Sequence, residues 1–365
     1  MIKKFYVNNV KGFENFEFDL SKTREYTFNK HQVKNGLINK GIIYGKNGSG
    51  KSNLGLAMHD IVYHLTDNKL LDLKYINNYL NLKLVDKEAE FNYTFLFDDI
   101  EYTYKYKKTA FNVLTYEEIQ VNDQTVLMYD FLTKEYEIKI EGLETLRIDL
   151  MDSRMSIVKY IYNNSISAEK SPISLIVKFV SGMLWFRCLV EGNSFIGATP
   201  NYATLDDFII ENNKINDFEI FLRENGLDYK LEKGFINGRY SLMARFEKGI
   251  VPLSSIISTG TQALWLYYSW SISFDKVKFL FLDEFDAFYH YETAELIFKL
   301  IDENKDLQSF VTTHNTYLMK NEFIRPDTCL ILSNNKINSL SNCTKKEIRE
   351  AHNLEKLYIN DAFNE

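Results

Sequence analysis

The sequence predicts an α/β fold with a mixed sheet, an antiparallel β subdomain and a helical insertion. Three observations predict it. A glycine-rich loop lies between an apolar strand and a helical stretch, two strand pairs alternate apolar and polar residues, and a later apolar strand ends in two carboxylates. Alternating strands and helices favour parallel strands, and paired alternating strands favour an antiparallel sheet. We therefore expect both kinds of strand pairing in this fold.

The glycine-rich loop reads GKNGSGKS and matches the spacing G-x-x-x-x-G-K-[ST]. In such a loop the backbone N–H groups surround phosphates, the lysine reaches the outer phosphates, and the last hydroxyl binds Mg²⁺. The apolar run at 40–45 predicts a buried strand before the loop, and helical spacing follows from Asn53, so a flexible glycine turn is disfavoured. The expected nucleotide-binding residues are Gly45, Lys46, Asn47, Gly48, Ser49, Gly50, Lys51, Ser52 and Asn53.

Composition places the chain among ordinary globular proteins. It has 365 residues, of which 45% are hydrophobic and 25% charged, and its net charge of −7 gives no overall attraction to nucleic acid, although a local basic groove stays open. The three cysteines, Cys188, Cys329 and Cys343, lack metal-type spacing and are expected to be reduced. Without a secretory start, the expected location is the cytoplasm. The longest apolar stretch, 174–190, contains Lys178 and Arg187 and favours a buried helix over a membrane span.

Three regions are expected along the chain. Residues 1–139 form an N-terminal lobe with an opening hairpin, the P-loop, and strand pairs that turn at Asp98-Asp99 and near Asn122-Asp123. Residues 140–234 form a helical insertion or arm, with one amphipathic element between Leu205 and Leu222. Residues 235–365 form the C-terminal lobe.

The segment KFLFLDEFDAF, from Lys278 to Phe288, predicts a buried parallel strand that ends in carboxylates. Asp283 is placed to hold Mg²⁺, and Glu284 is placed to polarise the attacking water as a general base. An isolated Asp-Glu pair would more simply be a solvated strand end. The P-loop in the same chain favours the catalytic interpretation.

Two further segments complete the candidate site. The segment SFVTTHN predicts another apolar strand that leads to His314, which can orient a terminal phosphate as a neutral donor. Upstream, 258–262 reads STGTQ directly before an expected helix, and its hydroxyls and glycine favour a second anion site. Taken alone, His314 would be an ordinary core or surface histidine, and the segment 258–262 would be an ordinary helix N-cap.

The order of these four motifs resembles the ABC ATPase class, in particular the branch with the SMC, RecF and overcoming-lysogenisation-defect proteins. The resemblance covers residues 1–60 and 235–330. It implies an ABC-type head that binds ATP and Mg²⁺, with a signature that touches the ATP of the opposite protomer. The implied roles are phosphate and catalytic lysine for Lys51, Mg²⁺ ligands for Ser52 and Asp283, catalytic glutamate for Glu284, switch histidine for His314, signature for Ser258 and Gly260, D-loop for Asp286, and an adenine neighbour for Lys11 or Phe13.

This sequence departs from the class in three respects. The signature has Thr259 and Thr261 where transporters have glycine, no Q-loop glutamine can be placed, and more than 200 residues separate the P-loop from the signature. That length points away from a transporter subunit. The segments 325–332 and 353–363 resemble the ends of ATP-binding proteins from bacterial antiphage and abortive-infection operons.

The resemblance implies an ATPase that forms a homodimer, or a higher even-numbered assembly, around ATP. We expect it to sense phage infection or foreign DNA and to govern an effector nuclease. That nuclease is expected to be a separate protein, because this sequence has no nuclease motif of its own. The alternative is an SMC- or RecF-like clamp that binds DNA in repair, although the basic runs 104–108 and 345–349 are typical of solvated faces. A membrane transporter subunit is the third and least favoured possibility.

Overall fold

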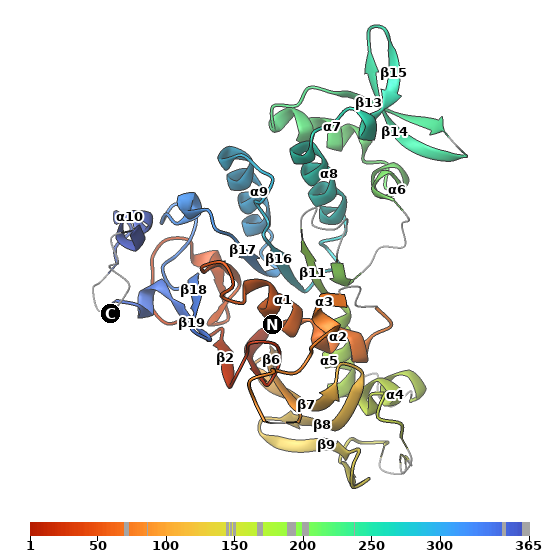
Figure 1. Ribbon diagram of the computed structural model, residues 1–365, viewed down its shortest axis with the longest axis vertical. Helices are drawn as coiled ribbons and strands as arrows, with labels where there is room; N and C mark the ends of the chain where they lie inside the picture. The colour runs from red at the N-terminus through yellow and green to blue at the C-terminus, as the bar shows by residue number, and fades with distance from the viewer. Residues whose placement is uncertain are drawn as a thin grey trace.

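The computed structural model describes residues 1–68, 73–85, 87–143, 146, 148, 151–165, 171–187, 195–198, 204–236, 238–344 and 348–359. Two seven-stranded sheets organise the fold (Figure 1). Cys188 and residues 345–347 and 360–365 lie outside the described residues.

The first sheet is antiparallel throughout. Its long hairpins turn at Asp98-Asp99 and Asn122-Asp123, where all four residues have positive φ, as tight hairpin turns require. Both strand pairs and the opening hairpin are confirmed. In spatial order the strands are β10 (Tyr136–Ile138), β9 (Gln124–Asp130), β8 (Val113–Val121), β7 (Ile100–Ala110), β6 (Ala89–Phe97), β1 (Ile2–Asn8) and β2 (Phe16–Asp19).

The second sheet has parallel central strands and an antiparallel strand at each edge. The strand before the P-loop is β5, and β17 lies between it and the Asp-Glu strand β16. The expected mixed α/β head is confirmed. In spatial order the strands are β12 (Phe195–Gly197), β11 (Met183–Arg187), β16 (Phe279–Asp283), β17 (Gln308–Thr312), β5 (Lys40–Tyr44), β18 (Cys329–Ser333) and β19 (Lys336–Ser339).

This mixed sheet separates two hydrophobic cores, because successive side chains of a strand point to opposite faces. Phe279 and Phe281 belong to the core shared with the antiparallel sheet, whereas Leu280 and Leu282 belong to the other core. On the first face, α1 packs on β16, and α5 packs on both β8 and α2. The helices on this side are α1 (Lys51–Met58), α2 (Asp60–Leu65), α3 (Leu73–Ile76), α4 (Ile157–Asn164) and α5 (Pro172–Ser181).

The opposite core extends into a projection with its own antiparallel sheet (Figure 1). There α6 packs on α8 and β14, and α7 packs on β13. The elements of this core are α6 (Leu205–Glu211), α7 (Ile215–Glu224), β13 (Lys230–Ile236), β14 (Arg239–Phe246), β15 (Gly249–Pro252), α8 (Thr259–Ser271) and α9 (Tyr291–Glu303). Leu354 of α10 (Leu354–Ile359) also belongs to this core, whereas the short pair β3 (Val33–Lys34) and β4 (Leu37–Ile38) lies outside it.

Three details differ from the sequence-based expectation. The apolar stretch expected to be one buried helix is α5 followed by β11, with Gly182 between them. The amphipathic element at 205–222 is two helices, interrupted at Asn213, whose φ is 56°. The region 140–234 therefore contains helices but also contributes β11 and β12 to the mixed sheet. Within the described residues, no helix has both the length and the apolar character needed to cross a bilayer.

Candidate nucleotide-binding site

The P-loop joins β5 to α1, as its flanking sequence predicted. Gly48 and Gly50 have φ values of 77° and 103°, which favour glycine. A Cβ atom built on Gly45 would lie 2.6 Å from the carbonyl oxygen of Leu332, so a side chain there would collide with β18. The glycines are therefore required by the path of the loop, with Lys46 and Asn47 exposed near its tip and Asn53 half-buried in α1.

Lys51 begins α1 and is 6% exposed. Its ammonium donates to the carbonyl oxygen of Gly45 at 2.8 Å and lies 3.0 Å from Nε2 of His314. Burial lowers the pKa of the Lys51 ammonium, and the carboxylates of Asp283 and Glu284 act in the opposite direction. The structure thus brings together the lysine, the histidine and the two acidic residues that the sequence singled out.

Asp283 is the last residue of β16 and is fully buried. Its Oδ1 accepts a hydrogen bond from Oγ1 of Thr312 at 2.8 Å, and the same Oγ1 accepts one from the backbone N–H of Glu284 at 2.7 Å. Glu284 has φ 51°, a left-handed conformation that is uncommon for a residue with a side chain. Thr312 of β17 therefore orients both carboxylate residues through one hydroxyl.

Arg187, which the sequence analysis did not select, contacts two of the expected metal ligands. Its Nη2 donates to Oγ of Ser52 at 2.6 Å and to Oδ2 of Asp283 at 2.5 Å. Its Nε donates to the same Oδ2 at 2.8 Å. Arg187 ends β11 directly opposite Asp283 in the parallel register. The signal that could have revealed it is a charged residue at the end of an apolar strand, which the expected helix obscured.

The segment after Glu284 is tied to the histidine turn. Oγ1 of Thr313 donates to Oδ2 of Asp286 at 2.7 Å, and burial raises the pKa of the Asp286 carboxyl. The same segment also packs against the start of α8. A Cβ atom on Gly260 would lie 3.1 Å from the carbonyl oxygen of Phe288, and the Tyr289 hydroxyl donates to the carbonyl oxygen of Ala263 at 3.0 Å.

Ser258 caps α8, and its side chain accepts a hydrogen bond from the backbone N–H of Thr261 at 3.3 Å. Ser258 is exposed. Among the hydrogen bonds of the described residues, none joins Ser258 or Gly260 to the P-loop of the same chain. The two anion-binding features predicted from the sequence are thus separate features of one protomer.

The opening hairpin reaches the P-loop through Phe13, whose ring lies 3.6 Å from a Cβ atom built on Gly50. The ammonium of Lys11 donates to the carbonyl oxygen of Asn77 at 2.5 Å and lies 5.6 Å from the centre of the Tyr75 ring. The structure therefore brings the phenylalanine to the loop by contact, and it directs the lysine toward the segment after α3.

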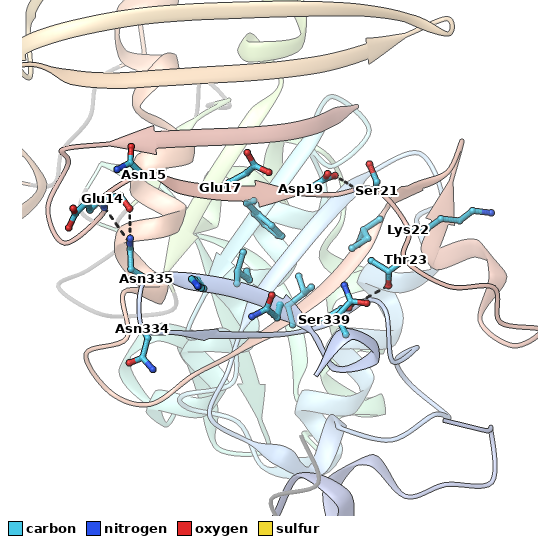
Figure 2. Close-up of a pocket in the computed structure, with 17 residues that line it drawn as sticks. Glu14, Asn15, Glu17, Asp19, Ser21, Lys22, Thr23, Asn334, Asn335 and Ser339 are labelled. Atoms are coloured by element: carbon cyan, nitrogen blue, oxygen red, sulfur yellow. Dashed lines mark hydrogen bonds between the residues drawn. The ribbon is translucent and has the colours of Figure 1, made fainter. Parts of the chain in front are cut away.

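A cavity of about 650 Å³ lies elsewhere, between the edge strands β2 and β19. Figure 2 shows Glu14 and Asn335 linked across one end of it and Thr23 and Ser339 near the other. Its lining includes residues of both signs and no residue of the P-loop. This cavity is distinct from the site around Lys51.

The family comparison identifies the chain. Residues 42–320 match the family described as "AAA domain, putative AbiEii toxin, Type IV TA system". No curated protein matches the sequence. Matched solved structures include the SMC head domain from Thermotoga maritima, at 17% identity over 92% of this chain and 97% of that chain, with a TM-score of 0.46.

Two other matched structures are an SMC head domain with bound ScpA and the recombination mediator RecF. An SMC head domain from Pyrococcus furiosus, with an extended coiled coil and bound to the C-terminal domain of ScpA, is 14% identical over 93% of this chain and 97% of that chain, with a TM-score of 0.43. The recombination mediator RecF with ATP is 13% identical over 93% of this chain and 99% of that chain, with a TM-score of 0.40. The strand order and the P-loop between β5 and α1 confirm a mixed α/β P-loop fold, and the match to an AAA domain family supports ATP hydrolysis. The chain belongs to the AAA domain family of putative AbiEii toxins of type IV toxin–antitoxin systems.

Proposed function

We propose that this ATPase is a switch controlled by ATP-dependent dimerisation. Two protomers, or pairs of protomers in a larger even-numbered assembly, enclose ATP between the P-loop of one copy and the Ser258 turn of the other. The observation that carries the proposal is the position of Ser258. It is exposed at the N-terminus of the 13-residue helix α8, where free backbone N–H groups favour an anion, and it makes no hydrogen bond to its own P-loop.

ATP joins such a dimer because each terminal phosphate contacts both protomers, and hydrolysis removes that contact. Glu284 is the proposed general base, since Thr312 holds its backbone N–H next to Asp283. Lys51 and His314 are the proposed phosphate contacts, because both lie at the carboxyl end of the parallel strands. The segment 286–288 is proposed to couple the histidine turn to the Ser258 turn, because Asp286 accepts a hydrogen bond from Thr313 and Phe288 packs against Gly260.

Ser52 and Asp283 are the proposed Mg²⁺ ligands. A hydroxyl and a carboxylate are oxygen ligands that Mg²⁺ accepts, and both already contact one cationic nitrogen, Nη2 of Arg187. The residues therefore fit the ion. When bound, Mg²⁺ neutralises charge that develops on the phosphates. Thr312 keeps the other oxygen of Asp283 occupied, so Oδ2 is the oxygen directed to the cation.

The proposed output is control of a separate effector protein, a nuclease, in antiphage defence in the cytoplasm. The family description, which names a toxin–antitoxin system, supports a role in such a defence. Within the described residues no group of three or more acidic, histidine or cysteine residues is placed to hold a metal ion. Cys329 and Cys343 are free thiols, which is compatible with a reducing compartment.

The DNA-clamp alternative has less support. Of the lysines in the basic run 104–108, Lys105 pairs with Glu118 at 3.4 Å, Lys107 lies 4.0 Å from Glu90, and Lys108 is buried against Asp60. These charges are compensated within the protein. A salt-dependent gel shift with purified protein would favour the clamp instead.

The test uses the variant Glu284→Gln, which keeps the phosphate contacts and removes the base. With ATP and Mg²⁺ it should elute at about twice the chain mass of 42.9 kDa, whereas Lys51→Ala should remain monomeric. In cells, both variants should lose protection against phage, and only Glu284→Gln should retain the effector on ATP-dependent purification. A monomeric Glu284→Gln variant with bound ATP would contradict the proposed switch.

A further inference from the structure

Arg187 makes three hydrogen bonds to the two proposed Mg²⁺ ligands. Its single Nη2 atom lies 2.6 Å from Oγ of Ser52 and 2.5 Å from Oδ2 of Asp283. Mg²⁺ binds oxygen ligands at about 2.0–2.1 Å and tolerates little departure from octahedral geometry. A nitrogen that lies between the same two oxygens leaves no room for the ion, so the guanidinium and Mg²⁺ exclude each other at these atoms.

The parallel pairing of β11 with β16 places the arginine there. Arg187 and Asp283 are partners in the register and are the last residues of their strands. Trp185 belongs to the core on the α1 side, and strand alternation places Arg187 on the same face. The position of Arg187 is thus a property of the sheet and does not depend on a surface loop.

Close approach of α1 to this face brings Ser52 within reach. A Cβ atom on Gly55 would lie 2.5 Å from the ring of Phe281 and 2.8 Å from that of Trp185. Only glycine permits this approach of helix to strands. Ser52 lies three residues before Gly55, almost one helical turn, so it lies on the same side of α1 and faces Arg187.

A cation is required beside Asp283. The Asp283 side chain is 0% exposed, and a buried carboxylate without a partner is strongly unfavourable. Among the described residues, the cationic group that contacts it is Arg187, whose side chain is 19% exposed. That partial exposure gives the guanidinium a path to solvent, whereas Asp283 cannot leave. Of the two partners, the arginine is the one that can be exchanged for another cation.

We propose that Arg187 is a built-in cation that holds Ser52 and Asp283 until nucleotide-bound Mg²⁺ replaces it. This inference rests on the Mg²⁺ assignment proposed above and concerns the regulation of that same site. Arg187 has to release both oxygens before Ser52 and Asp283 can bind Mg²⁺. The metal alone is therefore excluded, and the site accepts it together with the phosphates of ATP.

The test measures metal binding without nucleotide in the full-length protein, with Mn²⁺ as a spectroscopic substitute for Mg²⁺. The variant Arg187→Gln should bind one Mn²⁺ per chain about tenfold or more tightly than the wild type, because the competing hydrogen bonds to charged groups are lost. Mg²⁺ should also raise the melting temperature of Arg187→Gln and leave that of the wild type unchanged. The double variant Arg187→Gln, Asp283→Asn should lose both the tighter Mn²⁺ binding and the Mg²⁺-dependent rise in melting temperature.

Arg325→Gln is the matched control. Arg325 also pairs with a buried aspartate, Asp327, at 2.8 Å, in the segment before β18. This variant removes the same kind of ion pair outside the metal site, so its affinity for Mn²⁺ should equal that of the wild type. Equal Mn²⁺ affinity in Arg187→Gln and the wild type would overturn the proposal, and equal gains in Arg187→Gln and Arg325→Gln would also overturn it.

A second measurement on chains that keep Arg187 covers the case in which Arg187→Gln does not fold. The guanidinium carbon of Arg187 lies 6.0 Å from the ring of Trp185, so its departure should change the fluorescence of that indole. ATP with Mg²⁺ should change the emission component that Trp185→Phe lacks, and ATP with a chelator should leave it unchanged. An identical response to both overturns the exchange of cations, whereas failure to bind ATP and Mg²⁺ at all contradicts the proposed function.

Discussion

The ammonium nitrogen of Lys51 lies 3.0 Å from Nε2 of His314, which links the first turn of α1 to the segment after β17. A charged ammonium can only donate, so the imidazole nitrogen accepts at this contact. Two residues that are 263 positions apart in sequence are thus in direct contact beside the P-loop. This contact gives each residue a separate, testable role.

Lys51→Ala should lower ATP hydrolysis about 100-fold or more, because a buried cation directed at the phosphates is lost. Lys46→Ala is the matched control, since Lys46 is an exposed lysine of the same loop. Phosphate release and the affinity for a fluorescent ATP analogue should both fall in the first variant only. Comparable losses in the two variants would show that general charge, and not the position of Lys51, matters.

His314→Ala should retain ATP binding while hydrolysis falls about 100-fold, the usual scale for a positioned proton donor or acceptor. Its side chain is exposed and lies close to Lys51, so removing it should leave the fold intact. His352→Ala, which changes another exposed histidine outside the site, provides the control. Weakened ATP binding without a change in the rate of the bound complex would argue against this role.

Gly55→Ala should destabilise the protein by about 1–3 kcal/mol, because the new methyl group overlaps the ring of Phe281. The matched control is Gly12→Ala, where a Cβ atom would have no neighbour within 4 Å and φ is not positive. Urea unfolding of both variants checks the difference. If α1 is held away from β16 in solution, the two substitutions will have equal effects.

The buried carboxyl of Glu117 should make the free energy of unfolding depend on pH. Burial raises the pKa of its carboxyl from 4.5 to about 7, although Ser156, Tyr104 and the N–H of Ile157 donate to it. Between these values the folded chain holds a proton here that the unfolded chain has lost. The free energy of unfolding contributed by Glu117 therefore falls as the pH rises through this window, by up to about 3 kcal/mol.

The measurement for Glu117 is the difference in unfolding free energy between the wild type and Glu117→Gln from pH 4.5 to 7. Relative to the variant, the wild type should lose stability as the pH rises. Glu118→Gln is the control with the opposite sign. Although burial would raise its pKa, hydrogen bonds from Thr125 and Gln120 lower the pKa of Glu118 overall, so its contribution is lost as the pH falls. A pH-independent difference for Glu117→Gln would contradict the assignment.

Local patterns predicted the parts of the site that a single segment determines. The P-loop, the strand before it and the strand that ends at Asp283 each have a sequence signature, and the turn at Asp98-Asp99 has residues that tolerate positive φ. These features need no knowledge of the remaining chain. The structure places them as expected.

The contacts of Arg187 could not be predicted, because they depend on which strand pairs with β16. An apolar run such as 174–190 fits a buried helix and a buried strand equally well. The division of this run at Gly182 depends on the segment before β16, because a Cβ atom on residue 182 would lie 2.7 Å from the side chain of Lys278. For the same reason, the break between α6 and α7 had no clear signal in hydrophobic periodicity.

The most direct test of the central claim mixes two inactive variants. Lys51→Ala retains the Ser258 turn, and Ser258→Arg retains the P-loop. If the turn acts on the ATP of the other protomer, a mixed dimer has one intact site, so an equal mixture should hydrolyse ATP faster than either variant alone. No recovery, with mixed dimers demonstrated by differently tagged chains, would contradict the shared site.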